Sequence, residues 1–153
     1  MNVKRYGLLT VAVALLAIAL LSGCQQGTGT VVVATDATWP PMEFVNEDKE
    51  IVGFDIDLMN AIAEEAGFEV EYRNVAWDGI FAGLAAGEYD AIISSVTITE
   101  ERQEKYDFSD PYINAGQIVV TQIDSEITGP DTLAGHTVGA QIGTTGAFAV
   151  QDM

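Results

Sequence analysis

Short apolar runs and helical patterns alternate along the first part of the chain, which leaves few folds open to it. Val31–Thr35 (VVVAT) is a β-branched run typical of a buried parallel strand. Residues 68–72 alternate apolar and acidic side chains with the period of a strand, and residues 90–94 (DAIIS) form a third run. Apolar residues at helical spacing occupy 55–66 and 78–86, and a glycine follows each stretch. The order β-α-β-α-β predicts an α/β fold with a parallel sheet and right-handed crossovers.

A second set of elements is predicted after this unit. Residues 99–106 have the composition of a short charged helix, and residues 116–122 (GQIVVTQ) that of a strand. Residues 131–134 fit one helical turn, and residues 137–140 fit a short strand. A further helix is expected to begin within Gly143-Thr144-Thr145-Gly146. A second α/β unit therefore begins in this part of the chain.

The balance of charges excludes several classes of protein. The 153 residues include 6 Lys and Arg against 23 Asp and Glu, for a net charge of −17. Nucleic acid and anionic lipid surfaces are bound through basic side chains, so we expect neither as a partner of the folded domain. A single cysteine excludes an internal disulfide framework, a cysteine-rich zinc site and redox chemistry by a cysteine pair. A hydrophobic fraction of 48% is enough for a packed core.

The N-terminal segment has the pattern of an export signal. Two basic residues precede an uncharged run of 14 residues, Leu8–Leu21, which suits a signal peptide and is shorter than the roughly 20 residues of a membrane-spanning helix. Leu21-Ser22-Gly23-Cys24 resembles the bacterial lipobox, whose cysteine is lipidated and becomes the N-terminus. We expect a signal peptide over 1–23, lipidation of Cys24 and a flexible tether over 24–30. An uncleaved anchor and a buried free cysteine are the alternatives.

Three loops at one edge of the predicted sheet carry the candidate binding residues. Ligands of open α/β sheets bind outside the carboxyl ends of the strands. The candidates in and beside those loops are Asp36, Trp39, Trp77, Ser94, Ser95, Thr97 and Arg102. An arginine fork fits a carboxylate, backbone N–H groups add to an anion site, and two tryptophans can clamp an aliphatic or cationic side chain. Neither a nucleophile–base pair nor a metal-ligand cluster is evident, so we expect small-molecule recognition without catalysis, metal or cofactor.

Each candidate also has a purely structural interpretation. The two tryptophans could be core aromatics. Arg102 lies in a run of charged residues and could belong to a solvated helix face. Asp36 could be a turn or cap residue, and the two serines could simply end a strand. His136, the only histidine, is expected at the surface.

Several motifs occur together in a fixed order. They are Gly53-Phe54-Asp55-Ile56-Asp57-Leu58, Asp90-Ala91-Ile92-Ile93-Ser94-Ser95, Thr97-Ile98-Thr99-Glu100-Glu101-Arg102, Phe108-Ser109-Asp110-Pro111-Tyr112, and Val138-Gly139 with Gly143-Thr144-Thr145. Together they resemble the bacterial solute-binding protein family 3, the extracytoplasmic polar amino-acid receptors of ABC importers. That resemblance implies a periplasmic-binding-protein-like architecture of type II, with two α/β lobes that hinge strands join and that close over the ligand.

The resemblance also implies a role for each candidate. Trp39 and Trp77 would sandwich the substrate side chain, Arg102 would grip the α-carboxylate, and Asp36 would contact a polar or cationic side-chain tip. The residues that would share the carboxylate or contact the α-ammonium are Ser94, Ser95, Thr97 and Thr145. The expected receptor is monomeric and lipid-anchored, captures a polar and preferably basic amino acid outside the cytoplasmic membrane, and delivers it to the permease of the transporter.

Members of that family are usually far longer than this chain. We therefore expect a nearly complete lobe 1 over 31–115, a first hinge strand over 116–122 and a second lobe cut short over 123–153, as in an N-terminal fragment. Such a fragment would bind amino acids poorly, because one wall of the site would be incomplete. The alternatives are a non-functional fragment of such a receptor, an exported dehydratase, or a sensor domain of the same fold.

Overall fold

The structure, a computed structural model, describes residues 29–153. The predicted signal peptide, Cys24 and all but the end of the tether lie outside the described residues. Within the part that is described, no helix is both long and apolar enough to cross a membrane.

A three-stranded parallel sheet forms the centre of the molecule. Its strands are β1 (Thr30–Thr35), β5 (Glu69–Asn74) and β6 (Ala91–Ile92), in the spatial order β5-β1-β6. In register, Val33 lies opposite Tyr72 on one side and Ala91 on the other. β1 is central because its β-branched residues tolerate burial on both faces. The predicted α/β fold with a parallel sheet is confirmed.

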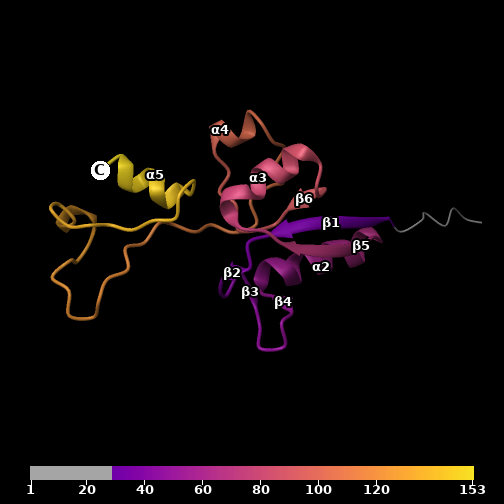
Figure 1. The fold of residues 1–153 in the computed structure, drawn as a ribbon, viewed down its shortest axis with the longest axis horizontal. Coiled ribbons are helices and arrows are strands. Elements are labelled where there is room, and N and C mark those ends of the chain that lie inside the picture. Colours follow the sequence, from indigo (N-terminus) through magenta and orange to yellow (C-terminus); the bar gives the residue numbers. More distant parts are fainter. Residues whose placement is uncertain (1–28) are drawn as a thin grey trace, which may run out of the picture.

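Two helices cover opposite faces of this sheet. α2 (Phe54–Ala66) lies on one side and α3 (Trp77–Ala86) on the other, as Figure 1 shows. Each helix ends at a glycine in the left-handed conformation, Gly67 with φ 77° and Gly87 with φ 73°, as the sequence predicts. With β1 and β5, α2 forms the first crossover unit, and α3 leads into β6.

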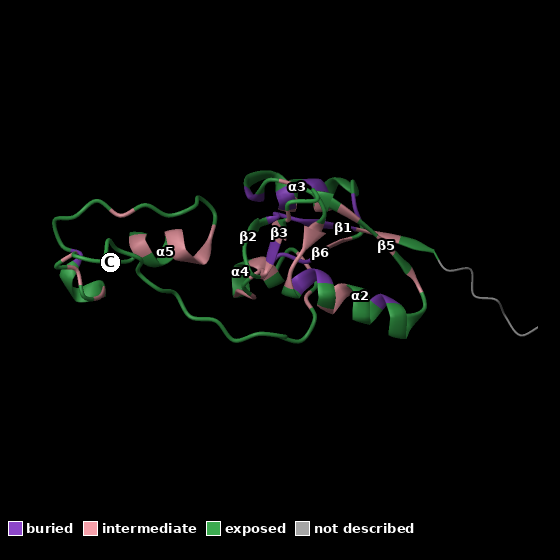
Figure 2. Cartoon of the chain, turned by 90° about the horizontal axis from the view of Figure 1, so that it is seen from below, coloured by how far each residue is buried: buried purple, intermediate pink, exposed green. Residues whose placement is uncertain are grey.

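The core lies between the sheet and these two helices. Val33, Ala34 and Ile80 have no exposed surface. On the α3 side, Ala34, Trp77, Ile80 and Tyr89 form one buried cluster. Figure 2 shows buried residues in β1, α2 and α3, whereas the chain between α4 and α5 is mostly exposed.

A small antiparallel sheet, which the sequence reasoning missed, follows β1. It contains β2 (Thr38–Trp39), β3 (Glu43–Val45) and β4 (Ile51–Val52). These strands are only two or three residues long, too short for a recognisable alternation of apolar and polar residues. The chain runs from this sheet into α2, and the Asp55 N–H donates to the Met42 carbonyl at 2.9 Å, which holds the start of α2 against the backbone just before β3.

The rest of the chain has little regular structure. α4 (Glu100–Gln103) is shorter than the predicted helix over 99–106, η1 (Pro130–Thr132) provides the predicted helical turn, and α5 (Thr145–Gln151) begins where expected. Thr144 caps α5 by accepting a hydrogen bond from the Ala147 N–H at 3.2 Å.

No strand forms at 116–122, which was predicted as the first hinge strand, or at 137–140. A strand exists only where a neighbour completes its hydrogen-bond ladder, and neither segment has one among residues 29–153. Ile118 and Val120 are accordingly 83% and 84% exposed. The β-branched composition of residues 116–122 therefore indicates that the segment is able to pair in a sheet, but it does not show that a partner strand is present.

Candidate functional site

The ends of the three parallel strands are held together by a chain of hydrogen bonds. After β1, the Asp36 N–H donates to Ser94 Oγ at 3.0 Å, which connects the loop that follows β1 to the loop that follows β6. Asp36 Oδ2 accepts from the Trp77 N–H at 3.2 Å, which adds the start of α3 after β5. Thr38 Oγ1 donates to Asp36 Oδ1 at 2.9 Å. The convergence predicted from strand order is therefore present, and Asp36, 3% exposed, lies at its centre.

Arg102 lies over this edge and is held by uncharged groups. Its Nη1 donates to the Thr97 carbonyl at 2.7 Å and its Nη2 to the Gly143 carbonyl at 3.0 Å. Its guanidinium carbon lies 5.5 Å from the ring centroid of Trp77 and 5.2 Å from that of Phe81. Among the described residues no carboxylate forms a salt bridge with it. Burial lowers the pKa of Arg102, which nevertheless stays protonated near neutral pH.

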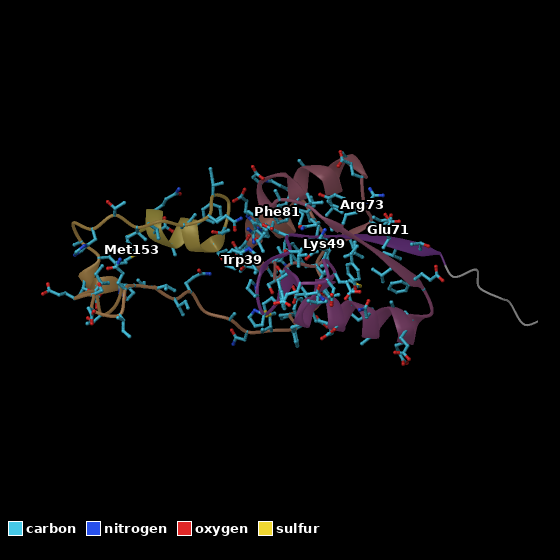
Figure 3. All side chains as sticks on the ribbon, turned by 60° about the horizontal axis from the view of Figure 1, so that its bottom comes forward. Trp39, Lys49, Glu71, Arg73, Phe81 and Met153 are labelled. Carbon is cyan, nitrogen blue, oxygen red and sulfur yellow. The ribbon has the colours of Figure 1, made fainter. Side chains whose placement is uncertain are left out.

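The two tryptophans differ in environment. Trp77 is 8% exposed, belongs to the core cluster and packs edge-on against Phe81 at 5.5 Å between ring centroids. Trp39 is 48% exposed, and Figure 3 shows it on the side of the molecule nearest α5. No ring–ring contact between them occurs in the described part of the chain. Trp77 therefore packs in the core with Arg102 over its ring, whereas the Trp39 ring is exposed.

The segment around α5 contributes polar groups to the same edge. The hydroxyls of Thr97 and Thr145 lie 3.1 Å apart, and Gln117 Nε2 donates to Thr145 Oγ1 at 3.0 Å. Gln141 Nε2 donates to Asp36 Oδ2 at 3.4 Å. Sequence reasoning named Thr145 but missed the two glutamines, which carry no signal of their own in a single sequence.

Two buried carboxyl groups lie directly behind the serines, and sequence reasoning missed both as parts of the site. Glu43 Oε1 accepts from Ser94 Oγ at 2.8 Å. Asp55 Oδ2 accepts from the Ser95 N–H at 2.6 Å, from Ser95 Oγ at 3.1 Å and from Tyr112 Oη at 3.0 Å. The available signal for Asp55 was the motif Gly53–Leu58, which contains it.

These contacts perturb the titration of the site. Burial, with the neighbouring Asp55 and Asp36, raises the pKa of Glu43 to about 8, against the hydrogen bond from Ser94. Burial and the carboxylate of Asp55 raise the pKa of Tyr112 well above its ordinary value. Tyr112 therefore stays a hydroxyl donor at any physiological pH.

His136 is exposed and lies in the segment before α5, outside the contacts described above. Among residues 29–153, no group of three or more His, Cys, Asp and Glu side chains is placed to hold a metal ion. The site at the strand ends therefore offers hydrogen-bonding groups, the Arg102 cation with free N–H donors and the exposed ring of Trp39.

Comparison with known proteins agrees with this geometry. Residues 31–148 match the model of the bacterial extracellular solute-binding proteins, family 3. The chain belongs to this family. The type II periplasmic-binding-protein fold of its relatives accounts for the parallel sheet between two helices and for the site at the carboxyl ends of its strands.

Two curated family 3 relatives are amino-acid-binding proteins. The probable histidine-binding protein of Neisseria gonorrhoeae is 37% identical over 122 residues, which cover 79% of this chain and 46% of the relative. The arginine-binding extracellular protein ArtP of Bacillus subtilis (strain 168) is 36% identical over 123 residues, which cover 80% of this chain and 48% of the relative. The chain thus spans about half the length of the curated relatives it matches.

Solved structures give the same assignment. An ancestral arginine-binding protein bound to arginine matches with a TM-score of 0.76 and 46% identity, over 81% of this chain and 55% of that one. The arginine-bound form of domain 1 from TmArgBP, as a Phe57Trp mutant, matches with a TM-score of 0.55 and 46% identity, over 57% of this chain and 68% of that one.

Proposed function

We propose that this chain is an extracytoplasmic amino-acid receptor of an ABC importer and binds its ligand without transforming it. The observation that carries the proposal is the Arg102 guanidinium, which two backbone carbonyls hold at the carboxyl ends of the strands and which has no carboxylate partner within residues 29–153. Its remaining N–H groups suit the carboxylate of an amino acid. Thr97 and Thr145 lie beside it and supply further hydroxyl groups.

The same site favours a basic ligand. Asp36 and Asp55 lie behind it, and Trp39 offers an exposed ring that a cationic or aliphatic side chain can cover. Asp36 already accepts hydrogen bonds from Thr38, Trp77 and Gln141. We therefore propose that Asp36 favours a cationic side-chain tip through its negative charge rather than through a further hydrogen bond. Relatives that bind arginine and histidine agree with this preference.

Much of the site belongs to the part of the chain that ends before residue 116. Seven of the eight candidate residues lie there, and domain 1 from TmArgBP, a single domain, was solved in an arginine-bound form. That observation weighs against the expectation that the 153-residue chain would bind poorly.

Anchoring through a lipid on Cys24 and transfer of the ligand to a permease complete the proposal.

The test is a titration of the purified chain with arginine, histidine and glutamine, followed by the backbone amide shifts of residues 94–102. Agmatine, which is arginine without its α-carboxylate, is the matched ligand. We expect saturable shifts with arginine, much weaker shifts with agmatine, and recovery of unchanged arginine. In Arg102→Ala the difference between the two ligands should disappear. Equal binding of arginine and agmatine by the unaltered chain would refute carboxylate recognition by Arg102.

A further inference from the structure

Glu43 on β3 and Asp55 at the start of α2 form a buried carboxyl pair beneath Ser94 and Ser95. Neither carboxyl residue has any exposed surface. Each accepts hydrogen bonds through one oxygen only, Glu43 from Ser94 and Asp55 from Ser95 and Tyr112. The other oxygens, Glu43 Oε2 and Asp55 Oδ1, are buried and have no hydrogen-bond partner among residues 29–153.

A glycine lets the start of α2, which carries Asp55, approach the backbone just before Glu43. Gly53, with φ 134°, precedes α2, and a Cβ at this position would lie 2.3 Å from the Met42 carbonyl oxygen. Without that Cβ, the first turn of α2 bonds to the backbone just before Glu43, through the Phe54 N–H to the Pro41 carbonyl and the Asp55 N–H to the Met42 carbonyl. Asp55 therefore lies beside β3 rather than in solvent, where the next acidic residue of the helix, Asp57, lies.

In the part of the chain that the structure describes, this pair has no cationic partner. Within the described residues neither carboxyl group forms a salt bridge with a lysine or arginine. The other titratable groups that face them are Asp36, which adds negative charge, and Tyr112, which donates a hydrogen bond to Asp55. Two carboxylates in such surroundings cannot both ionise at moderate cost, whereas one proton between them would satisfy both unpartnered oxygens.

The serines above the pair are held in an unusual geometry. Ser95 has a positive φ of 44°, which a non-glycine residue adopts only when its surroundings hold it there. Asp55 provides that restraint by accepting from both the backbone N–H and the hydroxyl of Ser95. Glu43 fixes the hydroxyl of Ser94, whose oxygen in turn accepts from the Asp36 N–H. The loop then continues to Thr97, whose carbonyl holds Arg102.

We propose that Glu43 and Asp55 share one proton and act together as positioning residues, which hold the Ser94–Thr97 loop and, through it, Arg102 in the geometry that binds an amino acid. The proton belongs on Glu43, because Glu43 accepts a single hydrogen bond, whereas Asp55 Oδ2 already accepts from three donors. The raised pKa of Glu43, about 8, agrees with this assignment. The part of the proposal that concerns binding rests on the proposed function; the shared proton does not.

The shared proton is tested first without any ligand. The side-chain carboxyl ¹³C resonance of Glu43 should titrate near pH 8, and Glu43→Gln identifies it. Because folding raises the pKa of this acid from its ordinary 4.5, the native state holds a proton that the unfolded chain has lost. As the pH rises from about 5 to 8, the unaltered chain should therefore lose stability relative to Glu43→Gln, and its denaturation midpoint should decrease. Above pH 8 the difference between the two midpoints should stay constant.

The matched control for that measurement is Glu47→Gln, which changes an exposed carboxylate in the turn after β3. It should follow the unaltered chain at every pH. A Glu43 resonance that titrates near its ordinary pKa, with denaturation midpoints of Glu43→Gln parallel to those of the unaltered chain, would overturn the shared proton whether or not the chain binds amino acids.

The positioning role is tested with arginine as the probe. In Asp55→Asn a neutral acceptor replaces a carboxylate under three donors, so arginine affinity at pH 7 should fall roughly tenfold. Asp57→Asn, on the exposed side of the same helix, should not change it. Between pH 7 and 9.5 the affinity of the unaltered chain should decline more steeply than that of Glu43→Gln. The α-ammonium of arginine also loses its proton in this range, but this affects the affinities of the unaltered chain and of Glu43→Gln equally and so does not contribute to the difference between them.

The outcomes separate the two proposals. Absence of arginine binding by the unaltered chain, with Glu43 titrating near pH 8, would refute the proposed function and leave the proton pair standing. Arginine binding that is equal in Asp55→Asn and Asp57→Asn, with identical pH profiles for Glu43→Gln and the unaltered chain, would overturn the positioning role. Where Asp55→Asn is found unfolded, the pH profile of Glu43→Gln decides between these outcomes alone.

Discussion

The carbonyl oxygen of Gly143 accepts a hydrogen bond of 3.0 Å from Nη2 of Arg102, 41 residues earlier in the chain. This contact places the Gly-Thr-Thr sequence before α5 against the edge formed by the parallel strands. Arg102 is therefore fixed between two segments, with its Nη1 on the Thr97 carbonyl and Trp77 and Phe81 beneath it. Arg102 therefore links the two segments, and we expect ligand binding to depend on it.

Replacement of Arg102 should weaken ligand binding in a graded way. Hydrogen bonds to charged groups contribute about 1.5–3 kcal/mol, so Arg102→Ala should raise the dissociation constant for arginine roughly ten- to a hundredfold. Arg102→Lys should recover only part of this loss, because an ammonium cannot present a fork. Calorimetry measures the effect, with Lys105→Ala, which removes an exposed ion pair to Glu101, as the control. Unchanged affinity in Arg102→Ala would assign Arg102 a purely structural role.

The two tryptophans should respond differently to truncation. Trp77 is 8% exposed and packs in the core, so Trp77→Ala should lower the free energy of unfolding by about 3–5 kcal/mol. Trp39 is 48% exposed, so Trp39→Ala should change stability by about 0.5 kcal/mol or less. Loss of its ring should instead weaken arginine binding by about 1 kcal/mol, roughly fivefold. Urea denaturation and calorimetry on the same samples separate the effects. Trp39→Ala with unaltered affinity would remove Trp39 from the site.

Two glycines of α3 form a matched pair for packing. A Cβ on Gly83 would lie 2.3 Å from the Tyr89 hydroxyl oxygen, which itself donates to the Ile80 carbonyl, whereas a Cβ on Gly79 would meet nothing within 4 Å. Gly83→Ala should therefore destabilise the chain by about 1–3 kcal/mol through overpacking. Gly79→Ala should stabilise it by about 0.5–1 kcal/mol through helix propensity. Thermal denaturation midpoints that shift equally in both variants would contradict the close packing of α3 on Tyr89.

Processing at Cys24 is predicted from the N-terminal sequence alone. When the chain is expressed in a bacterium, mass spectrometry of the membrane fraction should show an N-terminal Cys24 that carries a diacylglyceryl group. Cys24→Ser should abolish the lipid and release the protein from that fraction. An exported protein that retains Met1 would show that the lipobox interpretation is wrong.

Local sequence patterns were enough to predict the central layers of the fold. The apolar run in β1, the alternation in β5 and the helical spacing in α2 and α3 are each written within a few residues. Their order then left a parallel sheet as the arrangement to expect. The convergence of Asp36, Ser94 and Arg102 at one edge followed from the same topology, because all carboxyl ends of parallel strands lie on that side.

Contacts between segments distant in the sequence decided which strands form and which polar side chains are buried. The strand expected at 116–122 has no partner among the described residues and remains unpaired, and β2, β3 and β4 form although each is too short to show a period. Asp55 and Asp57 are alike in sequence and both lie in the first turn of α2, yet one is buried under Ser95 and the other is exposed. Residues two apart on a helix point to opposite sides, and the approach of α2 to Met42 at Gly53 decides that the side of Asp55 is the covered one.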